Sequence, residues 1–208
     1  MHPTTLYPKT RQVLLKLAPL DWLRDFYLAG GTALALQLGH RKSQDLDFFS
    51  ARFPKRELLF QRMARFQPKV IQEAPGTIDL TINEVKVSFL EYTYPLLEKP
   101  VQFNKVRLAG VKDIAGMKLS AVSSRGSKKD FVDLFVILKK YSLAELLNAF
   151  EKKFQGVKFQ KLHLLKSLAF FADADQDPDP EYLEKIAWEE VKKSLTRHLK
   201  NYLQSENI

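Results

Sequence analysis

The spacing of hydrophobic residues divides the chain into a part with strand-like alternation and a part with helical periodicity. The first part predicts helices over 10–24, 32–38 and 55–66 and strands over 26–29, 45–49, 77–82, 85–92 and 106–108. The second part predicts helices over 111–124, 129–140, 142–154, 159–171 and 181–203. Strands followed by helices indicate an α+β fold, with a mixed sheet in front and a helical bundle behind.

Composition narrows the classes of partner. A net charge of +9 over 208 residues favours polyanions such as nucleic acid or nucleotides. No apolar run approaches the roughly 18 residues that cross a bilayer, and the amino end lacks the apolar core of a signal peptide, so we expect a cytoplasmic protein without a membrane partner.

The absence of cysteine excludes disulfides, thiolate nucleophiles and Cys-ligated zinc. Any metal must therefore be a hard cation held by carboxylates. The acidic run over 173–184 imitates a calcium loop but has Pro178 where that loop needs glycine. We assign no calcium there and expect a loop between helices.

The most informative stretch is Phe26–Ser50, in which a strand, a helix opened by a glycine pair and a second strand follow one another. Gly30 and Gly31 let a polyphosphate approach the backbone, and the helix N-terminus offers N–H groups to that anion. Asp45 and Asp47 point to the same side of a strand and can chelate Mg²⁺. A tight turn and a strand-end aspartate are the structural alternatives, but the combination indicates a site for a nucleoside triphosphate and a metal.

Residues 105–129 hold seven basic residues and one acidic residue. Lys118 lies in the middle of an apolar helical stripe, where a lysine either extends to the surface or meets an anion. Arg125 and Lys129 belong to a loop rich in serine and glycine. Such a loop either holds phosphates of a nucleotide or RNA, or is a solvated basic loop.

Two further pairs of residues, one acidic and one basic, are candidates for the same site. Asp130 and Asp133 are one turn apart on a predicted helix and share a face. Asp130 has a simpler role near the helix N-terminus, so Asp133 is the stronger candidate for chemistry. His40 and Arg41 follow the helix over 32–38 and are placed to reach the nucleotide, with a C-terminal cap interaction as the alternative for His40.

The chain resembles the AbiEii/AbiGii family of abortive-infection toxins, within the polymerase-β-like nucleotidyltransferase superfamily. The similar blocks span about 26–191 and read GGTALALQLGHRKSQDLDFF, VKVSFLEYTYPLL, DIAGMKLSAVSSRGSKKDFVDLFVIL and FFADADQDPDPEYLEKIAWEEVK. The resemblance implies a nucleotidyltransferase core over 1–110 and a helical C-terminal subdomain over 111–208 that completes the active-site cleft.

The resemblance also implies residue roles. Gly31 and Thr32 match the turn that grips phosphate, and Asp45 and Asp47 match the metal ligands. A lysine that contacts the triphosphate corresponds to Lys118, and the acidic position of the later helix corresponds to Asp133.

One position departs from the pattern. Relatives of the polymerase type carry a third carboxylate on a neighbouring strand, where this chain has Ser88. The general base that deprotonates the acceptor is therefore open among Glu84, Glu91, Asp79 and Asp133.

The function that follows is transfer of a nucleoside monophosphate from an NTP to an acceptor, with Mg²⁺ or Mn²⁺ as cofactor. By resemblance and by the basic surface, the expected acceptor is the 3′ end of tRNA, and the expected partner is a cognate antitoxin. The alternatives are nucleotidylation of a protein, as in AMPylation, and a non-catalytic module that binds NTP or RNA.

Overall fold

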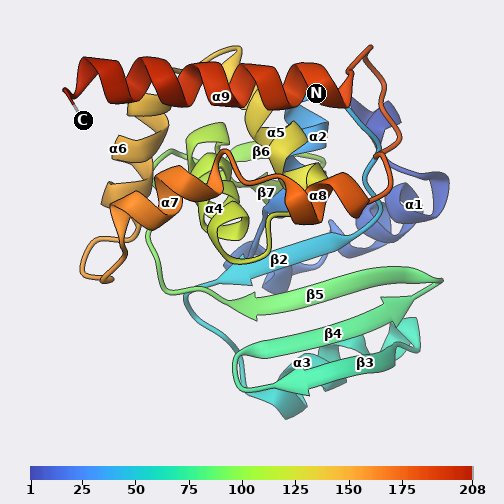
Figure 1. The fold of residues 1–208 in the computed structure, drawn as a ribbon. Coiled ribbons are helices and arrows are strands. Elements are labelled where there is room, and N and C mark those ends of the chain that lie inside the picture. Colours follow the sequence, from blue (N-terminus) through green and yellow to red (C-terminus); the bar gives the residue numbers. More distant parts are fainter. Residues whose placement is uncertain (208) are drawn as a thin grey trace.

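The computed structural model describes residues 1–207, which form a seven-stranded mixed sheet with helices packed around it (Figure 1). The strands are β1 (Tyr27–Leu28), β2 (Leu46–Ser50), β3 (Lys69–Ala74), β4 (Thr77–Ile82), β5 (Val85–Glu91), β6 (Val101–Phe103) and β7 (Val106–Leu108). The helices are α1 (Pro8–Leu17), α2 (Gly30–Leu38), α3 (Arg56–Met63), α4 (Val111–Ser124), α5 (Lys128–Leu138), α6 (Leu143–Lys153), α7 (Lys161–Ser167), α8 (Ala172–Gln176) and α9 (Trp188–Ser205). Short 3₁₀ turns are η1 (Pro3–Thr5), η2 (Asp21–Asp25) and η3 (Ala64–Phe66).

The strand order β3-β4-β5-β2-β1-β7-β6 puts β2 in the middle of the sheet. β5 runs parallel to β2, β1 runs antiparallel to it, and β3, β4 and β5 form an antiparallel meander. Side chains alternate between the two faces of β2, β4 and β5. One face is apolar and includes Phe48 and Phe89, which stack with ring centroids 5.6 Å apart and are fully buried. The polar residues of these strands therefore share the opposite face.

Helix α2 is short and almost completely buried. Gly30 begins it with φ +66°, and Gly39 ends it in the left-handed region with φ +80°. Its N-cap is Ala29, and no side chain caps its first turn. The backbone N–H groups at this end of the helix are therefore open to a ligand. The helix expected to start at Thr32 begins two residues earlier, so Thr32 is its third residue.

The C-terminal helices pack on one another and on α2, so the core runs through both halves of the chain. A buried ion pair supports this packing, because Lys153 Nζ lies 2.7 Å from Asp113 Oδ1, and the same carboxylate accepts hydrogen bonds from the backbone of Leu97. Gly110 is the N-cap of α4, so the predicted boundary at 110/111 lies between the last strand and the helical part. Division into two subdomains there remains a proposal.

The predicted order of elements is largely what the structure has, with differences at the ends of elements and two additions. The structure adds β6, and it has helix α8 at the start of the acidic run 173–184, where a loop was expected. The helix expected over 10–24 stops at Leu17 and is followed by η2, since Pro19 cannot continue it. The helix expected from 181 begins at Trp188, because the preceding residues are extended and Tyr182 forms a bridge with Arg41. Within residues 1–207 no helix has the length and apolarity to cross a membrane.

Candidate active site

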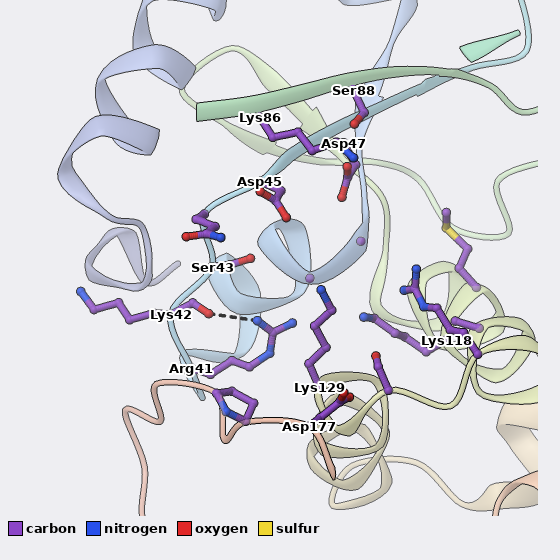
Figure 2. Close-up of a pocket in the computed structure, with 18 of the residues that line it drawn as sticks. Arg41, Lys42, Ser43, Asp45, Asp47, Lys86, Ser88, Lys118, Lys129 and Asp177 are labelled. Carbon is purple, nitrogen blue, oxygen red and sulfur yellow. Dashed lines mark hydrogen bonds between the residues drawn. The ribbon is translucent and has the colours of Figure 1, made fainter. Parts of the chain in front are cut away.

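A cavity of about 800 Å³ lies between the polar face of the sheet and the helical half of the chain (Figure 2). Strands β2, β4 and β5 form one wall, and the N-terminus of α2 lies beside it. Helix α4 and the loop before α5 form the opposite wall. The extended segment 177–181 lines a further part of it. The residues that line this cavity therefore come from segments between Tyr7 and Glu181 that are far apart in the sequence.

The sheet wall carries the carboxylates. Asp45 and Asp47 lie two residues apart and both line the cavity. Asp47 is opposite Ser88 on β5, and Ser88 is opposite Asp79 on β4, so these three side chains form a row across the sheet. Lys86, two residues before Ser88, places its Nζ 2.9 Å from Asp79 Oδ2. Figure 2 shows Asp45, Asp47 and Lys86 together on this side of the cavity.

The charge on this wall is incompletely balanced. Burial raises the pKa of Asp47, and the neighbouring charge of Asp45 raises it further. The charge of Lys86 and a hydrogen bond from Ser88 act in the opposite direction but do not cancel this increase. A carboxylate whose ionised form is disfavoured in this way attracts a cation.

Two side chains approach the glycine pair of α2 closely. A Cβ atom on Gly30 would lie 2.9 Å from Asp47 Oδ2, and a Cβ atom on Gly31 would lie 2.4 Å from a guanidinium nitrogen of Arg41. Glycine therefore lets an anionic and a cationic side chain approach the first turn of the same helix.

The helical wall carries cations, which buried carboxylates hold in place. Asp133 is fully buried, and its oxygens lie 2.7 Å from Arg41 Nε, 2.9 Å from Arg41 Nη2 and 2.6 Å from Lys118 Nζ. The ring of His40 adds Nε2 at 2.8 Å. Burial alone would raise the pKa of Asp133, but the charges of Arg41 and Lys118 hold it well below its usual value.

Asp130 repeats this arrangement one turn earlier. Its carboxylate lies 2.6 Å from Lys118 Nζ and 2.9 Å from Arg125 Nε, and it accepts a 2.7 Å hydrogen bond from Ser127 Oγ. Against the opposing effect of burial, the charge of Lys118 and these hydrogen bonds lower its pKa. Lys118 therefore bridges two buried carboxylates.

The cluster formed by these side chains contains three cations, Arg41, Lys118 and Arg125, and two carboxylates, Asp130 and Asp133. Only the three cations line the cavity. The cluster therefore presents a net positive charge to the cavity, opposite the carboxylates of the sheet wall. A wall of this kind can bind phosphate groups.

Comparison with known proteins identifies the family. The family described as nucleotidyl transferase AbiEii toxin, Type IV TA system, matches residues 12–95 and 65–205 of this chain. The chain belongs to the AbiEii family. It is also 39% identical over 211 residues to the uncharacterized protein aq_aa25 of Aquifex aeolicus (strain VF5), a match that covers 96% of this chain and 98% of that protein.

Two solved structures share the fold of this AbiEii protein. JHP933 from Helicobacter pylori has a TM-score of 0.57 at 18% sequence identity, over 95% of this chain and 91% of that one. MenT4, a nucleotidyltransferase toxin from Mycobacterium tuberculosis H37Rv, has a TM-score of 0.50 at 14% identity, over 96% of this chain and 87% of that one. The α+β nucleotidyltransferase fold expected from the sequence is confirmed, and the protein is a nucleotidyltransferase of this toxin family.

The structure brings most of the predicted site residues of the AbiEii protein to the cavity: Gly30, Gly31, Arg41, Asp45, Asp47, Lys118, Arg125 and Lys129. It does not bring the side chains of Thr32, His40 and Asp133 there. The Thr32 hydroxyl hydrogen-bonds to Ser43 Oγ and to the carbonyl oxygen of Asp45, so it fixes the entry to β2. His40 is buried against Asp133.

The four candidates for the third carboxylate lie in different places. Glu84 is at the exposed turn of the β4–β5 hairpin and pairs with Lys9, and Glu91 is exposed outside the cavity. Asp133 is buried behind the cations. Asp79 lines the cavity but pairs with Lys86. Within residues 1–207 no three Asp, Glu, His or Cys side chains are grouped closely enough to hold a metal ion.

Three parts of the cavity were missed by sequence reasoning. Lys86 had a signal, since it alternates with Ser88 on a strand and must share its face. Tyr7 and the segment 177–181 had none, because only the fold brings them to the cavity. Tyr7 donates a 2.7 Å hydrogen bond to Glu181, and the Asp177 carboxylate accepts one of 2.8 Å from the backbone N–H of Lys128.

Proposed function

We propose that this AbiEii protein transfers a nucleoside monophosphate from an NTP to the 3′ end of tRNA, with Mg²⁺ or Mn²⁺ as cofactor. The observation that carries this proposal is the cavity of about 800 Å³ with carboxylates on one wall and anchored cations on the other. That separation of charge matches a substrate that consists of a polyphosphate and a divalent cation.

The donor set on the sheet wall fits the metal. Asp45 and Asp47 offer hard carboxylate oxygens, and burial and the charge of Asp45 keep the pKa of Asp47 raised in spite of the opposing charges of Lys86 and Lys118. Two carboxylates suffice for Mg²⁺, which takes its remaining ligands from substrate phosphates and water. When bound, the ion would neutralise charge on the phosphates and orient them.

The triphosphate would lie against the other wall. The positive charge of that wall comes from Arg41, Lys118 and Arg125. The carboxylates of Asp130 and Asp133 hold these side chains in position. The free N–H groups at the start of α2 supply further donors. We therefore propose a positioning role for Asp133 in place of the direct catalytic role expected from the sequence, because it reaches the substrate only through Arg41 and Lys118.

The proposed reaction forms a bond between the acceptor hydroxyl oxygen and the α-phosphorus and breaks the bond from that phosphorus to the bridging oxygen of the β-phosphate. Pyrophosphate leaves, and the hydroxyl proton passes to a base or to water. Lys118 and Arg125 face the region where negative charge develops on the leaving phosphates, and fixed cations lower the barrier there.

The experiment incubates the protein with each labelled NTP, Mg²⁺ and either total tRNA or candidate proteins. We expect label on tRNA from wild type and from Asp173→Asn, a control at an exposed aspartate, and none from Asp47→Asn. Label on protein alone would support nucleotidylation of a protein. NTP or RNA binding without transfer would support a non-catalytic module.

As a member of a toxin family, the protein is further proposed to act with a cognate antitoxin. Expression of the wild type alone should arrest growth, because modification of an essential RNA at even about one turnover per second reaches many molecules per cell division. Co-expression of the partner should relieve the arrest. Arrest by a folded Asp47→Asn protein, at equal expression, would show that the harm comes from binding and not from chemistry.

A further inference from the structure

Lys86 lies on the same wall of the cavity as Asp45 and Asp47, and the proposed chemistry gives it no role. Its side chain is 43% exposed, lines the cavity and extends along the strands toward Asp47 (Figure 2). Asp79, on the adjacent strand, holds its ammonium at 2.9 Å. The direction in which this side chain lies is therefore fixed by a partner.

The charge of Lys86 acts on the whole carboxylate wall. Besides Asp79, both Asp47 and Asp45 raise the pKa of Lys86, so its ammonium lies within the electrostatic reach of three carboxylates. In the opposite direction, its charge lowers the pKa of Asp47. Lys86 therefore already behaves as a cation of this wall.

The geometry leaves little support for a second metal ion. A site for two metals clamps the attacking and the leaving oxygen with ions about 3.5–4 Å apart, and a third carboxylate would strengthen binding of the second ion. The strand residue opposite Asp47 is Ser88. Its neutral hydroxyl forms a hydrogen bond with Asp47 but does not supply the negative charge of a third carboxylate. Asp79 is paired with Lys86, and residues 1–207 contain no group of three metal-ligating side chains.

We propose that Lys86, anchored by Asp79, is the second cation of this site. A single divalent ion binds at Asp45 and Asp47, and the Lys86 ammonium supplies the positive charge beside it. This inference rests on the proposed metal-dependent transfer. It has a direct consequence: Lys86 weakens metal binding by repulsion while it contributes to turnover.

The experiment measures Mn²⁺ binding without nucleotide, by the EPR signal of free Mn²⁺, together with NMP transfer. We expect one Mn²⁺ per wild-type chain and none at this site in Asp47→Asn. Lys86→Met should bind Mn²⁺ about tenfold more tightly, because a positive charge on the same wall is removed, yet should transfer more slowly. Lys86→Arg should keep the wild-type affinity, and so should Lys69→Met, which removes an exposed lysine of β3.

The double variant Lys86→Met/Ser88→Asp gives a second measurement. It removes the protein cation and adds a carboxylate opposite Asp47, so we expect two Mn²⁺ per chain. Two Mn²⁺ in the wild type would overturn the inference and leave the proposed function intact, whereas none would overturn both. Unchanged or weaker binding by a folded Lys86→Met protein would also overturn the inference.

Discussion

Two pairs of aspartates belong to this site, one that lines the cavity and one that is buried behind its cations, and they have opposite surroundings. Asp45 directly precedes β2, Asp47 lies within it, and the two are short of cations. Asp130 and Asp133 lie on α5, and each forms ion pairs with two cations. Accordingly, the pKa of Asp47 is raised and the pKa values of Asp130 and Asp133 are lowered.

The difference shows that spacing alone does not assign a role to an acidic pair. Both pairs have the spacing that puts two carboxylates on one face of their element. Asp130 and Asp133 have already formed their ion pairs within the protein, so their effect on a substrate passes through Arg41, Lys118 and Arg125. Asp45 and Asp47 retain the capacity to bind a cation. The helical pair therefore belongs to the structure of the site, and the strand pair belongs to its chemistry.

Asp133→Asn should cause the largest change in stability. The substitution leaves Arg41 and Lys118 buried with one carboxylate fewer, and loss of one partner from a buried ion pair costs about 3–5 kcal/mol. Urea denaturation measures the free energy of unfolding, with Asp173→Asn as a control at an exposed carboxylate. A change below about 1 kcal/mol would contradict the assignment of Asp133 as an anchor.

Asp47→Asn should give the opposite result, with activity lost and stability kept. Loss of one of two metal ligands should lower the rate of NMP transfer by about 10²-fold or more, equal to about 2.7 kcal/mol. Because the substitution removes repulsion with Asp45, the metal-free protein should melt at the same temperature or higher. Thermal melting and labelled-NTP assays measure the two effects, and near-normal transfer by the folded variant would exclude the metal assignment.

The same comparison explains which parts of this site the sequence could predict. Asp45, Asp47 and the glycine pair are close in sequence, so the local pattern was enough to place Asp47 on a strand and the glycine pair at a helix start, whereas Asp45 lies one residue before the strand that was expected to include it. For Lys118 the sequence predicts two alternatives, a side chain that extends to the surface and one that meets an anion. Local pattern does not decide between them, because its partners Asp130 and Asp133 come from another helix. Thr32 was expected to grip phosphate and His40 to reach the nucleotide, but the direction of their side chains depends on tertiary contacts with Ser43 and Asp133.

Acid should separate the two pairs by the sign of its effect. For Asp130 and Asp133 the folded pKa lies below the unfolded value near 3.8, so their stabilisation is complete above that value and is lost as the pH falls through the folded pKa values. For Asp47 the folded pKa lies above the unfolded value, so its contribution is lost as the pH rises.

Unfolding free energies of the metal-free protein between about pH 3 and pH 7 test this prediction. Asp133→Asn should flatten the loss of stability in acid, and Asp47→Asn should reduce the loss on the neutral side. Equal pH profiles for the two variants would contradict the proposed difference between the pairs.

The smallest effect is expected from Lys129, which lines the cavity beside the anchored cations. If Lys129 contacts an RNA phosphate, Lys129→Ala should weaken binding of tRNA at low salt and should reduce the slope of log affinity against log salt by about 1. Arg125→Ala should change the slope similarly but should also lower stability, because Arg125 pairs with the buried Asp130. Filter binding between about 50 and 200 mM salt measures the slope. Affinity that does not depend on salt in the wild type would instead favour a protein acceptor, since phosphate contacts release counterions whichever RNA is bound.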